Sequence, residues 1–110
     1  MKLTVQEKIL MHLYRCRLRE GDPDERQTRF GIAKACRASE DSIGSELPKL
    51  MRAGWVGEHR TAVHGRTQRR LSAYTLTQEG EYAAQELIRE IVALHNKVLP
   101  LIEGKRDSQR

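Results

Sequence analysis

The sequence predicts a mostly α-helical protein of the α+β class, with three short helices, a two-stranded hairpin and one long final helix. Apolar residues recur at spacings of three and four in four segments, which is the period of an amphipathic helix. Between the third and fourth segments, two strand-like runs flank the turn dipeptide His64-Gly65. A chain of 110 residues is long enough for one core, so we expect one domain with an extension.

Each of the first three helices is preceded by a residue that can cap its N-terminus. The first helix spans residues 4–18, with Thr4 as the cap and Glu7 three residues later, which is the spacing of a capping box. Thr28 can cap the second helix, and Ser39 or Asp41 can cap the third. The side chains expected to face the core are Phe30, Ile32, Ala33 and Cys36 in the second helix and Ile43, Leu47, Leu50 and Met51 in the third.

Pro48 interrupts the pattern of the third helix. A proline inside a helix removes a hydrogen bond and costs ~3 kcal/mol or more. We therefore expect a helix that is bent at Pro48, or a shorter helix that begins near Ser45 with Pro48 in its first turn. Gly54 is suited to the position just after the end of this helix.

Residues 55–76 are predicted to form the hairpin, and its tip is basic. Trp55 and Val56 open the first strand, and residues 71–76 form the return strand. No acidic residue lies among the four arginines of the tip, which are Arg60, Arg66, Arg69 and Arg70. Such a ribbon suits contact with a phosphate backbone, and the net charge of +5 agrees with a nucleic-acid partner. The alternative is a solvated hairpin that is basic for solubility.

The last helix is predicted to open at Gly80 and Glu81 and to reach at least Leu99. Its apolar residues form a heptad seam, with Leu87, Ile91, Leu94, Val98 and Leu101 as the expected homodimerisation residues. The alternative is a helix that folds back onto its own domain. Pro100 is expected to end or kink the helix, and residues 104–110 are expected to form a flexible polar tail.

Two segments carry a recognisable motif. Residues 30–56, FGIAKACRASEDSIGSELPKLMRAGWV, place a small-residue stretch before a turn and then a leucine-x-x-leucine and a glycine-aliphatic ending. Residues 69–80, RRLSAYTLTQEG, end in leucine-threonine-x-x-glycine, in which Leu76 fills the core and Thr77 caps the next helix. Both segments resemble winged helix-turn-helix transcription regulators of the MarR-like and PadR-like type, over about residues 4–85.

The resemblance implies a winged domain at 1–80, a dimerisation helix at 81–103, and homodimeric binding to double-stranded DNA. The third helix would enter the major groove and the hairpin would follow the flanking backbone or minor groove. The DNA-binding residues that the resemblance implies are Ser39, Ser42, Ser45 and Lys49 on the recognition helix and Arg66, Arg69 and Arg70 on the wing. We add Arg52 near the end of that helix, and Arg60 and His64 on the wing, as expected phosphate contacts.

The third helix also departs from the usual pattern, because it holds Glu40, Asp41 and Glu46, and carboxylates repel phosphates. In addition, Thr67 and Gln68 precede Arg69 where MarR-like proteins often have an aspartate. Two alternatives therefore remain. One is a winged-helix module whose acidic third helix meets a basic protein. The other is the N-terminal DNA-binding module of a longer protein.

The sequence predicts neither an enzyme nor a cofactor. No Gly-rich phosphate loop or nucleophile–base spacing is present, and Ser42 and Ser45 near Lys49 read as a helix surface. His12 and Cys16 have ligand spacing, with Cys36 as a possible third group, but a buried thiol is the favoured interpretation and no metal is predicted. No apolar run has the length of a membrane span, and we expect a cytoplasmic protein with reduced cysteines. No polar cluster indicates a small-molecule effector.

Overall fold

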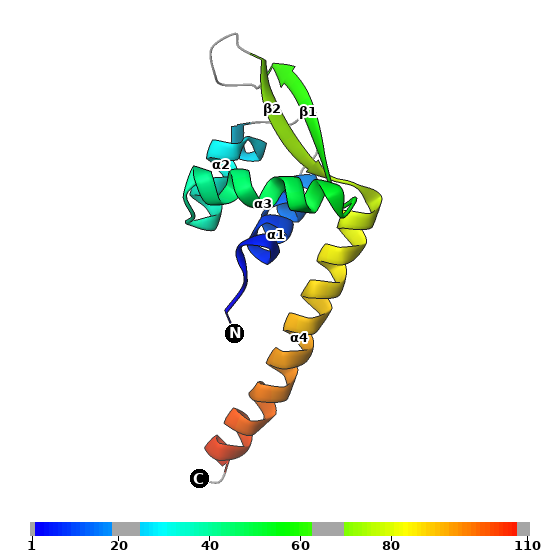
Figure 1. Cartoon of the computed structure of the whole chain (residues 1–110). Coiled ribbons are helices and arrows are strands. Elements are labelled where there is room, and N and C mark those ends of the chain that lie inside the picture. The colour runs from blue at the N-terminus through cyan, green and yellow to red at the C-terminus, as the bar shows by residue number, and fades with distance from the viewer. Residues whose placement is uncertain (1, 19–24, 63–69, 108–110) are drawn as a thin grey trace.

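The computed structural model describes residues 2–18, 25–62 and 70–107, with their side chains up to residue 60 and from 72 to 97 (Figure 1). A winged unit forms one end of the molecule, and a single long helix extends away from it. The elements in chain order are α1 (Val5–Arg17), the 3-10 helix η1 (Glu25–Gln27), α2 (Arg29–Cys36), α3 (Glu40–Arg52), β1 (Val56–Ala62), β2 (Arg70–Leu76) and α4 (Gln78–Asp107). This is the predicted mostly helical α+β fold.

The predicted caps of the first three helices are confirmed. The Thr4 hydroxyl accepts from the Glu7 N–H at 3.2 Å, and the Glu7 carboxylate accepts from the Thr4 N–H at 2.8 Å, which completes the capping box. Thr28 accepts from the N–H of residue 31 at 3.1 Å. Ser39 rather than Asp41 caps α3, because its hydroxyl accepts from the Ser42 N–H at 3.1 Å.

The core lies where α1, α2 and α3 meet the base of the hairpin and the first turns of α4. Its members are apolar and almost fully buried: Ile9, Leu10, Leu13, Ile32, Ala33, Cys36, Ile43, Leu47, Leu50, Val56, Leu76 and Ala84. Every element except η1 contributes to this cluster, so the hairpin base and the start of α4 belong to the same folded unit as the three helices.

The hairpin strands pair in antiparallel register from Val56 with Leu76 to Ala62 with Arg70. Trp55 lies just before β1 rather than in it, and β2 begins one residue earlier than expected, at Arg70. A single bridge joins Thr28 to Ala73, so the start of α2 is tied to the middle of β2. Neither this bridge nor η1 is predicted by the sequence.

The junction of the hairpin with α4 is held by backbone contacts. Thr77 caps α4, since its hydroxyl accepts from the Gly80 N–H at 3.0 Å and donates to the Gly54 carbonyl at 2.5 Å. The Thr77 N–H donates to the Trp55 carbonyl at 3.0 Å. A β-carbon on Gly80 would lie 1.9 Å from that same carbonyl oxygen, so only glycine fits here. The salt bridge from Arg17 to Glu81, at 2.8 Å, adds a link to α1.

Four expectations about the helices are wrong. α4 begins at Gln78, two residues before the expected start at Gly80. Phe30 is 46% exposed, because Ile32, Ala33 and Cys36 define the buried side of α2. The shorter form of α3 does not occur, since the helix runs from Glu40 through Pro48 to Arg52. Pro100 does not end α4, which continues to Asp107 and includes four residues that were expected in the tail. Buried apolar side chains hold α3 on its other face, which offsets the hydrogen bond that Pro48 removes.

Candidate nucleic-acid interface

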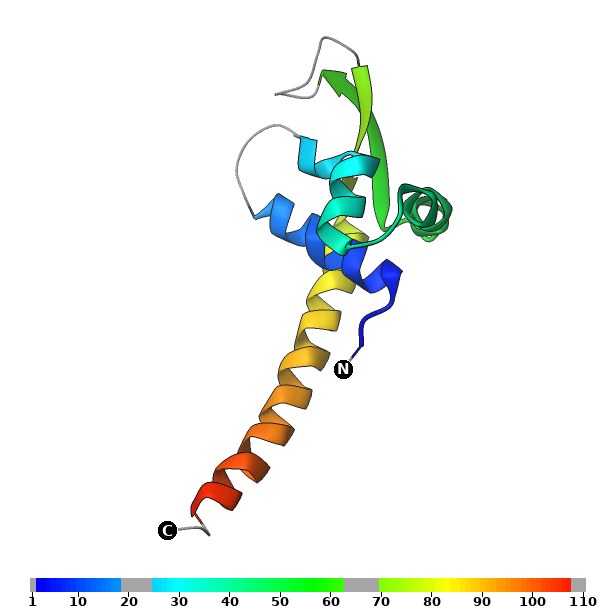
Figure 2. The same ribbon diagram turned by 90° about the vertical axis from the view of Figure 1, so that its left-hand side faces the viewer.

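α3 lies at the surface of the winged unit, with one face buried and one free. Figure 2 shows it nearly end-on, at the outer edge of the unit below the hairpin. Because Ile43, Leu47 and Leu50 fill the core side, the polar residues of the predicted recognition surface point outward. The structure leaves exposed all five of these residues, namely Ser39, Ser42, Ser45, Lys49 and Arg52.

Two of these residues, Ser39 and Ser42, also form hydrogen bonds within the first turn of α3. The Ser39 hydroxyl caps the helix and donates to the Ser42 hydroxyl at 3.0 Å. Both side chains therefore lie at the N-terminal end of α3, where unpaired N–H groups attract anions. Glu40 and Asp41 are exposed in the same turn and give that end a negative charge of their own.

Glu46 faces α1 instead of the free surface. Its carboxylate accepts from the Gln6 side chain at 2.7 Å and from the Lys49 ammonium at 3.3 Å. The hydrogen bond from Gln6, followed by the nearby Lys49, lowers the pKa of Glu46 below its usual value. The sequence alone groups Glu46 with Glu40 and Asp41 on one acidic face, and the structure separates them.

Arg29 is a basic residue of this region that the sequence analysis missed. It opens α2, and its guanidinium lies against Gly44 of α3, where an added β-carbon would be 3.1 Å from Nη1. Its charge also acts to lower the pKa of Tyr74, although burial and the Glu58 carboxylate raise that pKa overall. Arg29 is exposed and lies near both α3 and β2. A glycine at 44, in mid-helix, is the sequence signal for such a close approach.

The described part of the wing carries one exposed arginine and two polar pairs. Arg60 is exposed and pairs with Ser72 in the strand register. The Tyr74 hydroxyl donates to the Glu58 carboxylate at 3.4 Å across the strands. His59 Nε2 lies 2.9 Å from the Thr75 hydroxyl, so this histidine braces the hairpin.

The rest of the predicted wing cluster lies outside the described residues. This applies to His64, Arg66 and Arg69, and to the side chain of Arg70, whose backbone belongs to β2. Their role at the wing stays a prediction.

The apolar stripe of α4 divides into two parts. Ala84 and Leu87 are buried against the winged unit, and Ile91 is half-buried. Further along, Val92 is 50% and Leu94 is 42% exposed, and Figure 1 shows α4 running away from the other elements. The fold-back alternative therefore describes only the first turns of α4. The side chains of Val98 and Leu101 lie outside the described part of the chain.

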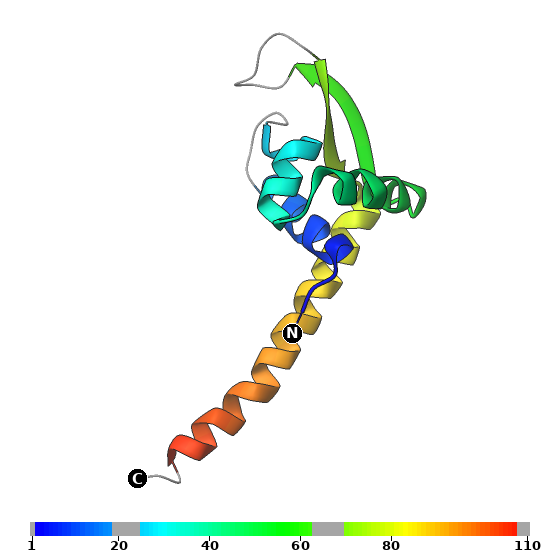
Figure 3. The ribbon, with the colours of Figure 1, turned by 60° about the vertical axis from the view of Figure 1, so that its left-hand side comes forward.

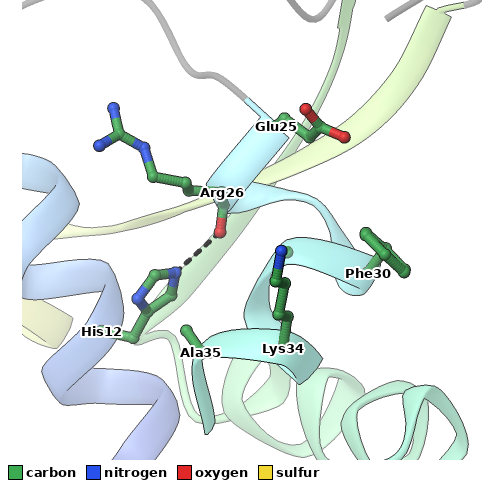
Figure 4. Close-up of a pocket in the computed structure, with 7 residues that line it drawn as sticks. His12, Glu25, Arg26, Phe30, Lys34 and Ala35 are labelled. Carbon is green, nitrogen blue, oxygen red and sulfur yellow. Dashed lines mark hydrogen bonds between the residues drawn. The ribbon is translucent and has the colours of Figure 1, made fainter. Parts of the chain in front are cut away.

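The histidine and the cysteines with ligand spacing do not form a metal site. His12 Nε2 lies 2.7 Å from the Arg26 carbonyl, as Figure 4 shows, and 3.7 Å from the Cys16 sulfur. A carbonyl only accepts, so this nitrogen carries its proton and is not free to bind a metal. Cys36 is buried, which raises the pKa of its thiol. Among the described residues, no three His, Cys, Asp or Glu side chains are placed to hold a metal ion.

Within the same described part of the chain, no helix is long and apolar enough to cross a membrane.

The architecture places the chain among winged-helix proteins. No protein-family model matches it, and no curated protein matches it. Among solved structures, MepR, a transcription regulator of the Staphylococcus aureus multidrug efflux pump MepA, matches with TM-score 0.69 at 20% identity, over 88% of this chain and 63% of MepR. A MepR–DNA complex matches with TM-score 0.66 at 16% identity, over 90% of this chain and 63% of that chain.

The heme sensor protein PefR from Streptococcus agalactiae matches with TM-score 0.64 at 17% identity, over 86% of this chain and 58% of PefR. The chain therefore spans about three fifths of the length of these proteins, given the coverage of 63% of MepR and 58% of PefR. At these identities the similarity establishes the fold, which is the MarR-like winged helix that the sequence predicts.

Proposed function

We propose that this protein binds double-stranded DNA as a homodimer and acts as a transcription regulator. The observation that carries the proposal is a set of exposed polar and basic side chains, on the outer face of α3, on Arg29 beside Gly44, and on Arg60 of the wing. The fold shared with the MepR–DNA complex supports it. Such a regulator acts at the chromosome, so we place it in the cytoplasm and expect no catalytic activity.

Each group on this surface has a role that follows from its chemistry. Ser42 and Ser45 carry short hydroxyls, which bond to base edges or phosphates in the major groove. Lys49, Arg52 and Arg29 provide positive charge for the phosphates. The Lys49 ammonium also forms an ion pair with Glu46 at 3.3 Å, so we expect Lys49 to contribute the least of the three to phosphate binding. The wing residues Arg60, His64, Arg66, Arg69 and Arg70 would follow the flanking backbone.

Homodimerisation through α4 is the second half of the proposal. Leu94 and Val92 expose apolar surface on a helix that has left its own domain, and exposed apolar surface favours association. Leu87, Ile91, Leu94, Val98 and Leu101 form the proposed seam. A two-fold axis there would set the two copies of α3 about one DNA turn, roughly 34 Å, apart.

Fluorescence anisotropy of a labelled mixed-sequence duplex, titrated at several salt concentrations, tests DNA binding. The proposal expects a steep decrease of affinity with salt, because each phosphate contact adds about one unit to the slope. Arg69→Ala with Arg70→Ala should weaken binding to all sequences about equally and flatten the slope by about two units. Lys97→Ala removes one positive charge from the exposed surface of α4, away from the wing, and is the control that should leave the slope unchanged.

Light scattering after size exclusion tests the dimer separately. Ile91→Glu with Leu94→Glu should yield monomers, because two charges would face the partner's apolar seam. A dimer mass that survives both substitutions would place the interface elsewhere, without affecting the DNA-binding half of the proposal.

A second candidate function rests on Glu40 and Asp41, which are exposed at the start of α3. These carboxylates suit a basic protein surface better than a phosphate backbone. Absence of DNA binding at low salt, in the same titration, would favour this protein-interaction module.

A further inference from the structure

A cleft lies between α1 and α2. Figures 2 and 3 both show α1 and α2 side by side, with α3 on their right. The cleft consists of two adjoining hollows, of about 260 and about 490 Å³, which share His12 and Ala35 as lining residues. The larger hollow is within the range of about 300–1,000 Å³ that small ligands occupy.

The smaller hollow is lined by cations from two helices. Lys8 and Arg15 project from one face of α1, seven residues apart, and Arg37 comes from the end of α2. Among the described residues, no carboxylate lines this hollow, and none forms an ion pair with Lys8, Arg15 or Arg37. Like charges that share a hollow repel one another, so an anion placed among them would stabilise the fold.

Arg37 also has an unusual backbone conformation for a residue with a side chain. Its φ of 54° and ψ of 45° are left-handed, a conformation in which glycine is the usual residue at the end of a helix. An arginine adopts it only at a cost in conformational energy, and Arg37 is one of the residues that line the hollow.

The larger hollow, drawn in Figure 4, is of a different character. Phe30, Gly31 and Ala35 contribute apolar surface, and Phe30 is 46% exposed, the aromatic side chain that the sequence analysis had expected in the core. Three charged residues, Glu25, Arg26 and Lys34, also line it. An aromatic ring next to a cationic hollow suits a ligand with an apolar body and a charged end.

We propose that this cleft binds a small organic phosphate monoester, with its phosphate among Lys8, Arg15 and Arg37 and its apolar body against Phe30. A phosphate monoester carries about −1.5 to −2 charges at pH 7, which matches three cations better than the single charge of a carboxylate does. Its three oxygens can accept from all three side chains at once. The site does not depend on the proposed DNA-binding function.

Isothermal titration calorimetry of the whole protein with phenyl phosphate, inorganic phosphate and benzoate tests the proposal at constant ionic strength. Phenyl phosphate should bind saturably, about tenfold more tightly than either of the others, since only it combines a phosphate group with an apolar ring. Arg37→Gly and Arg15→Gln should each weaken phenyl phosphate about tenfold or more, whereas Lys97→Gln on α4 should not. Arg37→Gly suits the left-handed backbone and Arg15 is exposed, so both variants should fold.

Three results would overturn the proposal. One is equal binding of phenyl phosphate and inorganic phosphate, which would leave no role for Phe30. Another is that neither phenyl phosphate nor inorganic phosphate gives a heat of binding, while Arg15→Gln has a lower melting temperature than the wild type. This would mean that the cations only stabilise helix ends. The third is loss of DNA affinity in Arg15→Gln and Arg37→Gly without any phosphate binding by the wild type, which would make the cleft a backbone contact for DNA.

Discussion

Replacing Gly80 with alanine tests the tightest contact in the fold. The new methyl group would lie 1.9 Å from the Trp55 carbonyl oxygen and 2.7 Å from its carbon, where an ordinary contact needs about 3.4 Å. The start of α4 must therefore retreat from Trp55 by more than about 1 Å. That retreat stretches the Thr77–Trp55 hydrogen bond, which is 3.0 Å long in the native structure.

The expected magnitude follows from three terms. Overpacking of this kind costs about 1–3 kcal/mol, and loss of the hydrogen bond adds about 0.5–1.5 kcal/mol. The better helix propensity of alanine stabilises the variant by about 1 kcal/mol and offsets part of this loss. The free energy of unfolding should therefore fall by about 0.5–3.5 kcal/mol. Each kcal/mol lowers the melting temperature by about 4 °C or more.

Urea unfolding followed by fluorescence is the natural assay, because Trp55 is the single tryptophan of the chain and lies at the contact itself. Protein concentration must be equal in all samples, since association would shift the apparent stability. Gly57→Ala is the matched control, because its β-carbon would meet only the His59 ring, at 3.6 Å. If Gly80→Ala unfolds at the same urea concentration as Gly57→Ala and the wild type, the argument from close approach is refuted.

Three further outcomes are expected. Arg37→Gly should stabilise the fold by about 1 kcal/mol in anion-poor buffer, because it removes the cost of an arginine in the left-handed conformation. Thermal unfolding measures this change, and a lower melting temperature than that of the wild type would contradict the prediction. Glu46 has a lowered pKa, so its contribution to stability is present above the usual carboxyl pKa of 4.5 and is lost as the pH falls through the folded value. Urea midpoints of the wild type should thus decline more on acidification below pH 4.5 than those of Glu46→Gln, and parallel declines would contradict the assignment. Arg29→Gln should weaken DNA binding for all sequences alike and flatten the salt slope by about one unit, whereas a changed base preference in anisotropy would show that Arg29 reads sequence.

Local signals in the sequence predict most of the fold. Caps such as Thr4, Thr28 and Thr77 mark helix starts because their short side chains bond to N–H groups only two or three residues away. The hairpin register follows from two strands joined by one turn, and only the ends of the strands differ from the prediction. Such features depend on neighbours along the chain, so they are readable without the tertiary structure.

The errors arise where a local pattern gives too little information. α2 has only eight residues, and on a helical wheel Phe30 lies about 110° from the mean direction of Ile32, Ala33 and Cys36. Its apolar character suggested burial, and the geometry of the helix excluded it. Proline likewise predicts an interruption, yet packing elsewhere along α3 outweighs the missing hydrogen bond.

The candidate site is less predictable than the fold because its groups meet across the sequence. The contact of Arg29 with Gly44 and that of Glu46 with Gln6 join residues that are far apart in the chain. Residue type shows which side chains are charged, and it does not show which of them are engaged by a neighbouring helix. For the same reason, the cleft that joins Lys8 to Arg37 has no counterpart in the sequence patterns.

The close backbone contact at Gly80 fixes the direction in which α4 leaves the winged unit. The helix has 30 residues, which corresponds to about 45 Å at 1.5 Å for each residue. A tilt of only about 5° at the first turn would therefore displace the far end by about 4 Å. Only a few contacts set the tilt of α4 relative to the winged unit. They are the contact between Trp55 and Gly80 and the ion pair of Arg17 and Glu81. A small change of packing at the first turn of α4 would therefore cause a larger displacement at its far end. Any second molecule bound near that end would be displaced as well.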